Sequence, residues 1–292
     1  MANYYCGVDG GGTSCRARIV DGNGQFLGEA KTGSANILLG VELAMENIQR
    51  AISQAAEQAG ILDLSTLSVG LALAAAEQKS AWYAFMALPH PYMHMTLNTD
   101  GYGACMGAFG GGNGAIVIAG TGSVGLYLEN GHQHVVGGRE FPISDQGGGA
   151  VMGLRLIQET LLAYDGLRAP SAMSDHVLAH FNHDIDAIVA WSKTATPRDY
   201  GQFSPKIFEL AMARDTLAMA LLQGSAADIE RLILGLNRKG AQQIALMGSI
   251  GERIVPWLSP AVQSLLVPPQ ADAMAGAILM ARGDHNLFPF PR

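Results

Sequence analysis

Residues 7–19, GVDGGGTSCRARI, decide how the chain folds. An apolar run from Tyr4 to Val8 leads into this stretch and an alternating run from Arg16 to Val20 follows it, a pattern typical of strand, tight turn and strand. Three successive glycines leave the turn without Cβ atoms, so backbone N–H groups can approach an anion closely. The stretch therefore predicts a phosphate site on a β-hairpin; a glycine-rich hairpin without a ligand is the alternative.

The residues that flank the three glycines favour the phosphate site. Thr13 adds a hydroxyl donor where the turn ends, and Asp9 stands where it begins. A carboxylate there would repel a phosphate unless a cation lay between them, so Asp9 predicts a Mg²⁺ ion held through water. Two better-known phosphate loops are excluded. There is no lysine for a P-loop, and residues 16–24 favour a strand and a second hairpin turn instead of the helix of a dinucleotide loop.

The composition indicates a globular chain with a large core. A length of 292 residues favours two domains or one large one. Of these residues 49% are hydrophobic and 15% are charged, which is ample for buried cores. A formal net charge of −7 argues against nucleic acid or an anionic membrane as the partner. Cys6, Cys15 and Cys105 are too scattered for a disulfide framework and predict reduced, buried thiols. We find neither a secretory signal nor a membrane-spanning run, and expect a cytoplasmic protein.

The pattern of the first turn returns in the middle of the chain. Residues 115–128 again have the order strand, glycine–threonine turn and strand. Thr13 precedes Asp21 by eight residues and Thr121 precedes Glu129 by eight, so the two meanders match at both of their turns. Chance similarity of two hairpins is the alternative to a duplicated domain, which we prefer.

A duplication predicts two α/β domains. The predicted domains are residues 1–114, joined by residues 270–292, and residues 115–269. If the two hairpins face each other, they would clamp the phosphates of a nucleotide, with the acceptor in the cleft between the domains. Within the second domain we interpret residues 265–267 as the last strand and residues 196–201 as a loop.

Five motifs resemble, in order, those of the sugar-kinase, heat-shock-chaperone and actin superfamily, whose fold is a duplicated ribonuclease H-like domain with an interdomain active-site cleft. The first turn and Gly120 to Ser123 resemble its two phosphate motifs, and Gly248 to Gly251 resembles its adenosine motif. Thr99 to Gly101 and Asp272 to Ala281 resemble its two connecting segments. Each motif alone is weak, but together they cover nearly the whole chain.

Within that superfamily the chain is similar to the N-acetylglucosamine kinase-like and activator-ATPase family, above all to the bacterial glucosamine kinases of chitin catabolism. Residues 137–147 and 190–205 carry much of this resemblance. It implies a phosphotransferase that uses ATP and Mg²⁺ to phosphorylate the 6-hydroxyl of glucosamine, with a homodimer as a compatible assembly. N-acetylglucosamine is the alternative substrate. An activator ATPase of a radical dehydratase is a distant alternative, and it would depend on Cys105 to hold an iron–sulfur cluster.

The resemblance also implies roles for individual residues. Asp100, at the end of a strand and the start of a helix, is our general base; helix capping is the competing interpretation. Asp145 is a second candidate base, which we assign to a substrate-binding turn. The implied sugar-binding residues are Asn36, Asp100, Ser123, Gly138, Arg139, Glu140 and Asp145. The implied nucleotide-binding residues are Gly10, Gly11, Gly12, Thr13, Gly120, Thr121, Gly122, Gly248, Ser249 and Gly251.

One stretch departs from the pattern of the N-acetylglucosamine kinases. Gly138-Arg139-Glu140 stands where those enzymes have Gly-Trp-Gly, and Val124 replaces an asparagine. Both changes argue against recognition of an acetamide group. Glu140 would instead face the free 2-ammonium group of glucosamine, because opposite charges attract strongly in a partly desolvated site.

Overall fold

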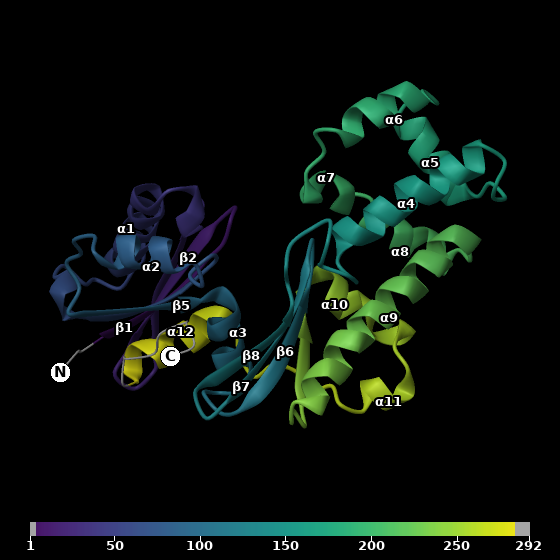
Figure 1. Cartoon of the computed structure of the whole chain (residues 1–292). Coiled ribbons are helices and arrows are strands. Elements are labelled where there is room, and N and C mark those ends of the chain that lie inside the picture. The colour runs from purple at the N-terminus through teal and green to yellow at the C-terminus, as the bar shows by residue number, and fades with distance from the viewer. Residues whose placement is uncertain (1–3, 284–292) are drawn as a thin grey trace. The chain divides into compact units, whose positions relative to one another are not determined.

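The computed structural model describes residues 4–283 of the chain (Figure 1). These residues form two compact units: residues 4–114 with 128–133 and 268–283, and residues 115–127 with 134–267. Each unit combines one β-sheet with helices and has a hydrophobic core of its own. The predicted α/β fold class, with two ribonuclease H-like halves, is confirmed. The predicted domain limits stay a prediction.

The first unit is built on a five-stranded sheet in the order β3-β2-β1-β4-β5. Its strands are β1 (Tyr4–Gly10), β2 (Cys15–Asp21), β3 (Phe26–Thr32), β4 (Leu67–Leu73) and β5 (His94–Thr99). Its helices are α1 (Val41–Gln58), α2 (Lys79–Met86), α3 (Asp100–Ala108) and α12 (Ala273–Arg282), with 3-10 turns at Ile37–Leu39 and Leu64–Thr66. Because β1, β4 and β5 run parallel, Gly10, Leu73 and Thr99 lie in one register at the carboxyl edge.

Helices cover both faces of this sheet. Cys6 and Val8 of β1 belong to the buried cluster that also holds the apolar side chains of α1. Gly7, which points the other way, has no room for a Cβ, which would lie 2.1 Å from the carbonyl oxygen of Met274 in α12. Glycines of the sheet thus allow α12 to pack closely on it.

A four-stranded sheet in the order β8-β7-β6-β9 has most of its residues in the second unit. The strands are β6 (Gly114–Ala119), β7 (Ser123–Glu129), β8 (His132–Gly137) and β9 (Ile244–Met247). The helices are α4 (Gly149–Tyr164), α5 (Ala172–His180), α6 (Ile185–Ser192), α7 (Pro197–Gly201), α8 (Ser204–Met212), α9 (Thr216–Arg238), α10 (Gly248–Ile254) and α11 (Pro260–Gln263), with a 3-10 turn at Val255–Trp257. β6 pairs parallel with β9, so the second glycine turn and the start of α10 follow the same sheet edge.

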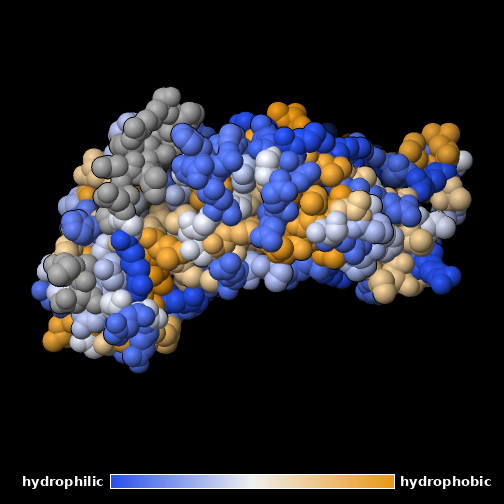
Figure 2. Space-filling view, turned by 90° about the horizontal axis from the view of Figure 1, so that it is seen from below, coloured by the Kyte–Doolittle hydropathy of each residue, from blue (hydrophilic) through white to orange (hydrophobic). Residues whose placement is uncertain are grey.

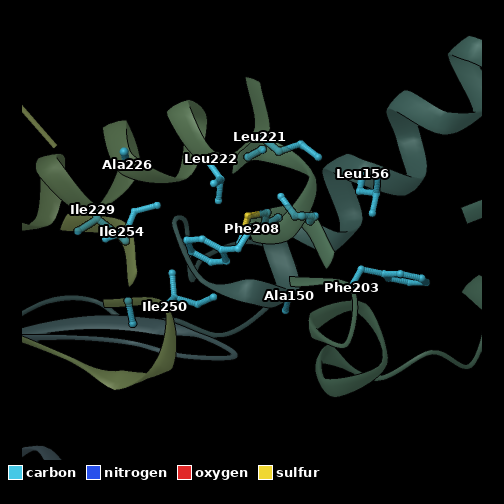
Figure 3. Packing of buried hydrophobic residues seen from close by; sticks show 14 of the residues in the cluster. Ala150, Leu156, Phe203, Phe208, Leu221, Leu222, Ala226, Ile229, Ile250 and Ile254 are labelled. Atoms are coloured by element: carbon cyan, nitrogen blue, oxygen red, sulfur yellow. The ribbon is translucent and has the colours of Figure 1, made fainter. Parts of the chain in front are cut away.

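The core of the second unit lies where its helices pack together (Figure 3). Phe208 of α8 is buried among side chains of α9 and α10, including Leu222 and Ile254. Burial of a large aromatic side chain of this kind stabilises the fold by about 1.5–3 kcal/mol. The core therefore fixes α8 and α10 beside the second glycine turn.

Two predicted elements of the second unit are wrong. Residues 265–267 do not form a strand, because only one isolated bridge joins Leu266 to Ile244. Residues 196–201 are not a loop but contain α7, which begins with a capping box between Thr196 and Asp199 and has proline in its first turn. Three apolar residues are too few to identify a strand, whereas the capping box was a readable helix signal.

The described surface is mixed in character. On the face shown in Figure 2, hydrophobic residues lie in separate patches among hydrophilic ones. Between residues 4 and 283 no helix combines the length and the apolar character needed to cross a membrane. Cys6, Cys15 and Cys105 are buried and free, as predicted.

Candidate active site

The first glycine turn is closed by its own backbone and tied to the loop that precedes α1. The N–H of Gly11 donates to the carbonyl of Ser14 (2.9 Å), and the carbonyl of Gly11 accepts from the N–H of Ala35 (3.0 Å). Asn36 follows directly, and its Oδ1 accepts from the N–H of Leu38 (2.9 Å). The structure thus holds Asn36, which we predict to bind the sugar, beside the first turn, and its side-chain NH₂ group has no acceptor among residues 4–283.

The glycines of this turn are required for different reasons. A Cβ on Gly10 would lie 2.6 Å from the side chain of Leu73, so packing demands a glycine there. Nothing lies within 4 Å of a Cβ built on Gly12, which is exposed together with Thr13. Within residues 4–283 no backbone carbonyl accepts from the N–H of Gly12 or Thr13. The tip of the turn therefore offers two backbone donors and a hydroxyl.

Asp9 is paired with a cation that the sequence analysis did not foresee. Arg16 lies opposite it on β2, and Nη2 of Arg16 contacts Oδ2 of Asp9 at 2.6 Å. The other carboxylate oxygen remains for a water molecule in the shell of a Mg²⁺ ion, which prefers one or two carboxylates together with phosphate oxygens. Across the described residues no cluster of three or more His, Cys, Asp or Glu side chains forms a metal site. A single carboxylate is compatible only with an ion held mainly by a nucleotide, and the assignment of Mg²⁺ to Asp9 stays a prediction.

Asp100 is the first residue of α3, at the same sheet edge as the first turn. The helix is capped by Thr99, whose hydroxyl accepts from the N–H of Tyr102 (3.0 Å), so the interpretation of Asp100 as the capping residue is wrong. Asp100 is exposed as a residue, although protein atoms crowd its carboxyl, and its Oδ1 accepts from the N–H of Gly101 (2.8 Å).

The electrostatic surroundings of Asp100 make it a stronger base than an ordinary aspartate. Its pKa is raised mainly because protein atoms displace water around the carboxyl, and further because Glu77 and Asp9 carry like charge. The N–H of Gly101 acts in the opposite direction. A carboxylate with a raised pKa at a solvent-accessible sheet edge can accept a proton from a hydroxyl group.

The second glycine turn is supported by a helix. The N–H groups of Gly149 and Ala150, at the start of α4, donate to the carbonyls of Gly120 (2.8 Å) and Thr121 (2.9 Å). A Cβ on Gly148 would lie 2.8 Å from the carbonyl oxygen of Thr121, so this contact needs a glycine. The turn therefore lies on the positive end of the 16-residue helix α4, which favours a bound anion.

The loop before α4 carries two carboxylates. Asp145 has a φ of 66° and Glu140 a φ of 70°, both in the left-handed region. The Asp145 carboxylate accepts from the backbone N–H of Ser123 and lies against Gly122, where a Cβ would come within 2.5 Å of its Oδ2. The pKa of Asp145 is raised by burial and, secondarily, by the charge of Glu140. The structure thus brings together Ser123, Glu140 and Asp145, and their role in sugar binding stays a prediction.

The remaining members of the predicted sugar site lie on the same loop. Gly138 has a φ of 63° and packs so closely on Val124 that a Cβ would come within 2.7 Å of it. Val124 thus serves as a packing partner of the loop. Arg139 is exposed, and its N–H donates to the hydroxyl of Ser144 (3.0 Å).

The adenosine-type motif begins α10 at the end of β9. Gly248 has a φ of 88°, and a Cβ there would lie 2.5 Å from the carbonyl oxygen of Ala119. This contact places the motif beside the second turn, whereas Gly251 packs on Leu246. Ser249 is exposed.

A cavity of about 170 Å³ lies between the second turn and this motif. Gly120, Thr121 and Ser249 line it, as do Ser204 and Arg253, which the sequence analysis missed. No pattern in the sequence marks Ser204 or Arg253. Ser204 begins α8 and Arg253 lies in α10, and these helices bring the two residues to one cavity only in the folded chain.

The iron–sulfur alternative depended on Cys105. This thiol is buried in α3, and its Sγ donates to the carbonyl of Gly114 (3.3 Å). Burial raises its pKa to about 12, so the thiolate that a cluster requires is strongly disfavoured.

Known proteins resemble the chain over most of its length. A profile of the BadF/BadG/BcrA/BcrD ATPase family matches residues 6–281. Glucosamine kinase GspK of Vibrio cholerae serotype O1 is 62% identical over 98% of either chain. N-acetyl-D-glucosamine kinase of Dictyostelium discoideum is 23% identical over 85% of this chain and 86% of its own. The crystal structure of a candidate N-acetylglucosamine kinase from Chromobacterium violaceum matches with a TM-score of 0.88 and 32% identity, covering 96% of this chain and 99% of that one.

Proposed function

Because the chain belongs to the BadF/BadG/BcrA/BcrD ATPase family, we propose that it transfers the γ-phosphoryl group of ATP to the 6-hydroxyl of glucosamine, giving ADP and glucosamine 6-phosphate. The observation that carries this proposal is the 62% identity to a glucosamine kinase over nearly the full length of both chains. We place the reaction in amino-sugar catabolism, where chitin breakdown would supply the substrate.

Asp100 is the general base of this proposal. Phosphoryl transfer requires a carboxylate that orients the acceptor hydroxyl and takes its proton as the oxygen attacks phosphorus. Asp100 is accessible, its pKa is raised, and the capping role is already filled by Thr99. Asp145 is bound to the N–H of Ser123 and lies in a strained turn, which suits a residue that binds the sugar.

The two glycine turns are the phosphate-binding elements of this proposal, and they favour phosphate in different ways. The first offers the N–H groups of Gly12 and Thr13, which have no backbone acceptor among the described residues. The second lies on the amino end of α4, where the N–H groups of Gly149 and Ala150 already donate to carbonyls of the turn, so α4 contributes the positive end of its dipole. Mg²⁺ would neutralise charge on the phosphate oxygens, and Asp9 is the residue that would hold it through water.

The charge of the loop before α4 favours glucosamine over its N-acetylated form. Glu140 and Asp145 are close enough for Glu140 to raise the pKa of Asp145. A free 2-ammonium group would relieve this repulsion, whereas a neutral acetamide group would not. N-acetylglucosamine remains the second candidate substrate, since relatives at 32% and 23% identity carry that name.

The test is a coupled assay of ADP release with glucosamine, N-acetylglucosamine, glucose and mannosamine as acceptors. We expect the highest kcat/KM with glucosamine. A higher kcat/KM with N-acetylglucosamine would overturn the substrate assignment, and no ADP release with any of the sugars would overturn the kinase assignment.

A further inference from the structure

A separate cavity lies in the first unit, between α12 and the outer strands of the five-stranded sheet. Its volume is about 630 Å³, within the range of about 300–1,000 Å³ that is typical of pockets for small organic ligands. Among the described residues that line it, none belongs to the predicted sugar or nucleotide site. The cavity is therefore a candidate for a second binding site.

The cavity arises from the way α12 lies on the sheet. A Cβ on Gly7 of β1 would lie 2.1 Å from the carbonyl oxygen of Met274, so α12 rests directly on this strand. In the neighbouring β2, Ile19 belongs to the core on the opposite face, so Arg18 and Val20 point toward the side of α12. The outer strands β2 and β3 therefore form a hollow beside the helix.

Much of the cavity wall is apolar. Ala275 and Leu279, four residues apart on α12, lie on one face of the helix and line the cavity. Val20 of β2 and Phe26 of β3 are paired in the sheet and line it as well. Phe26 is 59% exposed, so a ligand with a hydrophobic body would remove apolar surface from water here.

The charged side chains of the cavity leave one cation without an anionic partner. Arg18 is fully engaged, because it donates to Glu29 (2.8 Å) and through two nitrogens to Asp272 (2.8 and 3.0 Å). Arg282 instead donates to the backbone carbonyl of Asp21 (3.0 Å). Within residues 4–283 no carboxylate forms an ion pair with Arg282. The charge balance of the cavity thus favours an anion at Arg282.

The guanidinium group of Arg282 is held in place at the cavity. Its carbon lies 4.7 Å from the centroid of the Tyr5 ring, and its Nη2 makes the contact with Asp21. A guanidinium group carries five N–H donors in a fixed plane, so further donors remain for a ligand.

We infer that this cavity binds a small organic anion with a hydrophobic body, a ligand distinct from the sugar and the nucleotide. Its anionic group pairs with Arg282, and its body lies against Phe26, Ala275 and Leu279. Inorganic phosphate has no such body and would leave these walls exposed. The inference goes beyond the proposed function and does not depend on it.

The test uses two dyes with the same ring system, titrated by fluorescence into the full chain. Anilinonaphthalene sulfonate carries an anionic group, whereas N-phenylnaphthylamine lacks this group and is neutral. The anionic dye should bind saturably, with one molecule per chain. Since neither ATP nor sugar is present, the outcome is independent of the proposed function. An absence of saturable binding of the anionic dye would overturn the inference.

A substitution at Arg282 tests the anionic contact. Arg282→Gln should weaken the anionic dye about five- to tenfold and leave the neutral dye unchanged, because glutamine still donates to a carbonyl but carries no charge. Arg50→Gln is the matched control and should bind both dyes like the wild type. Arg50 is also exposed and donates to a neutral oxygen, Oδ1 of Asn47 (2.7 Å), but lies outside the cavity. Unchanged affinity of Arg282→Gln for the anionic dye would overturn the inference.

Substitutions in the walls test the place of binding. Ala275→Phe, which fills the cavity, should weaken both dyes about tenfold or more, and Phe26→Thr should weaken both about three- to fivefold. Circular dichroism verifies folding. Because Phe26 is exposed, Phe26→Thr decides the question if Ala275→Phe does not fold. Unchanged affinity for the anionic dye in a folded wall variant would show that the dye binds elsewhere, the nucleotide site included, and would overturn the inference.

Two other occupants of the cavity would show themselves in the same titrations. The sequence continues beyond α12 with residues 284–292, which lie outside the described part and include Leu287, Phe288 and Phe290. Replacing these three residues by serine should leave the affinity for the anionic dye unchanged, and binding about tenfold tighter would show that this segment fills the cavity. Affinity that falls as the protein concentration rises would show that a second copy of the chain covers it. Either result would overturn the inference.

Discussion

The two glycine turns share one sequence pattern but are supported in different ways. The first closes on itself through Gly11 and Ser14, and its tip lies free. The second lies on α4, and a Cβ on Gly122 would come within 2.5 Å of the Asp145 carboxylate. Similar glycines therefore serve packing in the second turn, whereas Gly12 in the first has open space around it. Equivalent substitutions in the two turns should therefore separate effects on stability from effects on the proposed ATP binding.

The largest expected effect is on kcat and concerns the carboxylate near each turn, Asp100 at the first and Asp145 at the second. Asp100→Asn should lower kcat by about 10²- to 10⁴-fold, because a positioned base is lost. Asp145→Asn should mainly raise KM for glucosamine. Steady-state kinetics of the two variants, with circular dichroism to verify folding, measure both effects. If Asp145→Asn lost more kcat than Asp100→Asn, the roles of the two carboxylates would be exchanged.

The raised pKa of Asp100 leads to a second prediction, about pH. In wild-type protein kcat/KM for glucosamine should fall on the acid side with an apparent pKa above the ordinary 3.8 of aspartate. A carboxyl whose pKa is higher in the folded state stabilises the fold below its unfolded pKa and loses that contribution as pH rises through the folded value. Asp100→Asn should therefore be the more stable protein at pH 7 by thermal unfolding. A lower melting temperature of Asp100→Asn at that pH would contradict the conclusion that burial and like charges raise the pKa of Asp100.

An alanine in each turn compares the two supports directly. Gly122→Ala should lower the free energy of unfolding by about 1–3 kcal/mol, since the new methyl group must displace Asp145. Gly12→Ala should leave stability within about 0.5 kcal/mol and raise KM for ATP. Urea unfolding and ATP kinetics measure the two effects. Equal losses of stability in both variants would show that the two turns are not supported differently.

A smaller effect tests the loop that packs on the second turn. Glu140→Gln should lower the preference for glucosamine over N-acetylglucosamine about five- to tenfold, as a charge-assisted contact with the ammonium group becomes a neutral one. Ile143→Gln, on the same loop and exposed, is the control and should keep the preference. Competition between the two sugars measures the ratio, and an unchanged ratio in Glu140→Gln would remove Glu140 from recognition.

Local patterns made most of the fold predictable. The strands on either side of the two glycine turns were predicted and are present as β1, β2, β6 and β7, because apolar and alternating runs mark them. α7 was missed although a capping box announced it, and residues 265–267 lacked the length that identifies a strand. Local signals thus carried the prediction, and errors arose where segments were short.

The candidate site was predictable where glycines stand next to acidic or hydroxyl-bearing residues in the sequence. Both turns and Asp100 follow strand ends, a position that periodicity reveals. Ser204 and Arg253 reach the cavity only through helix packing, and Arg16 meets Asp9 only through strand register. Contacts between segments distant in sequence leave no such pattern.

The most direct test of the central claim is the identity of the product. Purified protein incubated with ATP, Mg²⁺ and glucosamine should give one sugar phosphate whose phosphorus, in a proton-coupled ³¹P NMR spectrum, couples to the two protons on C6. Coupling to the anomeric proton instead, or no sugar phosphate while ATP is hydrolysed, would contradict the account.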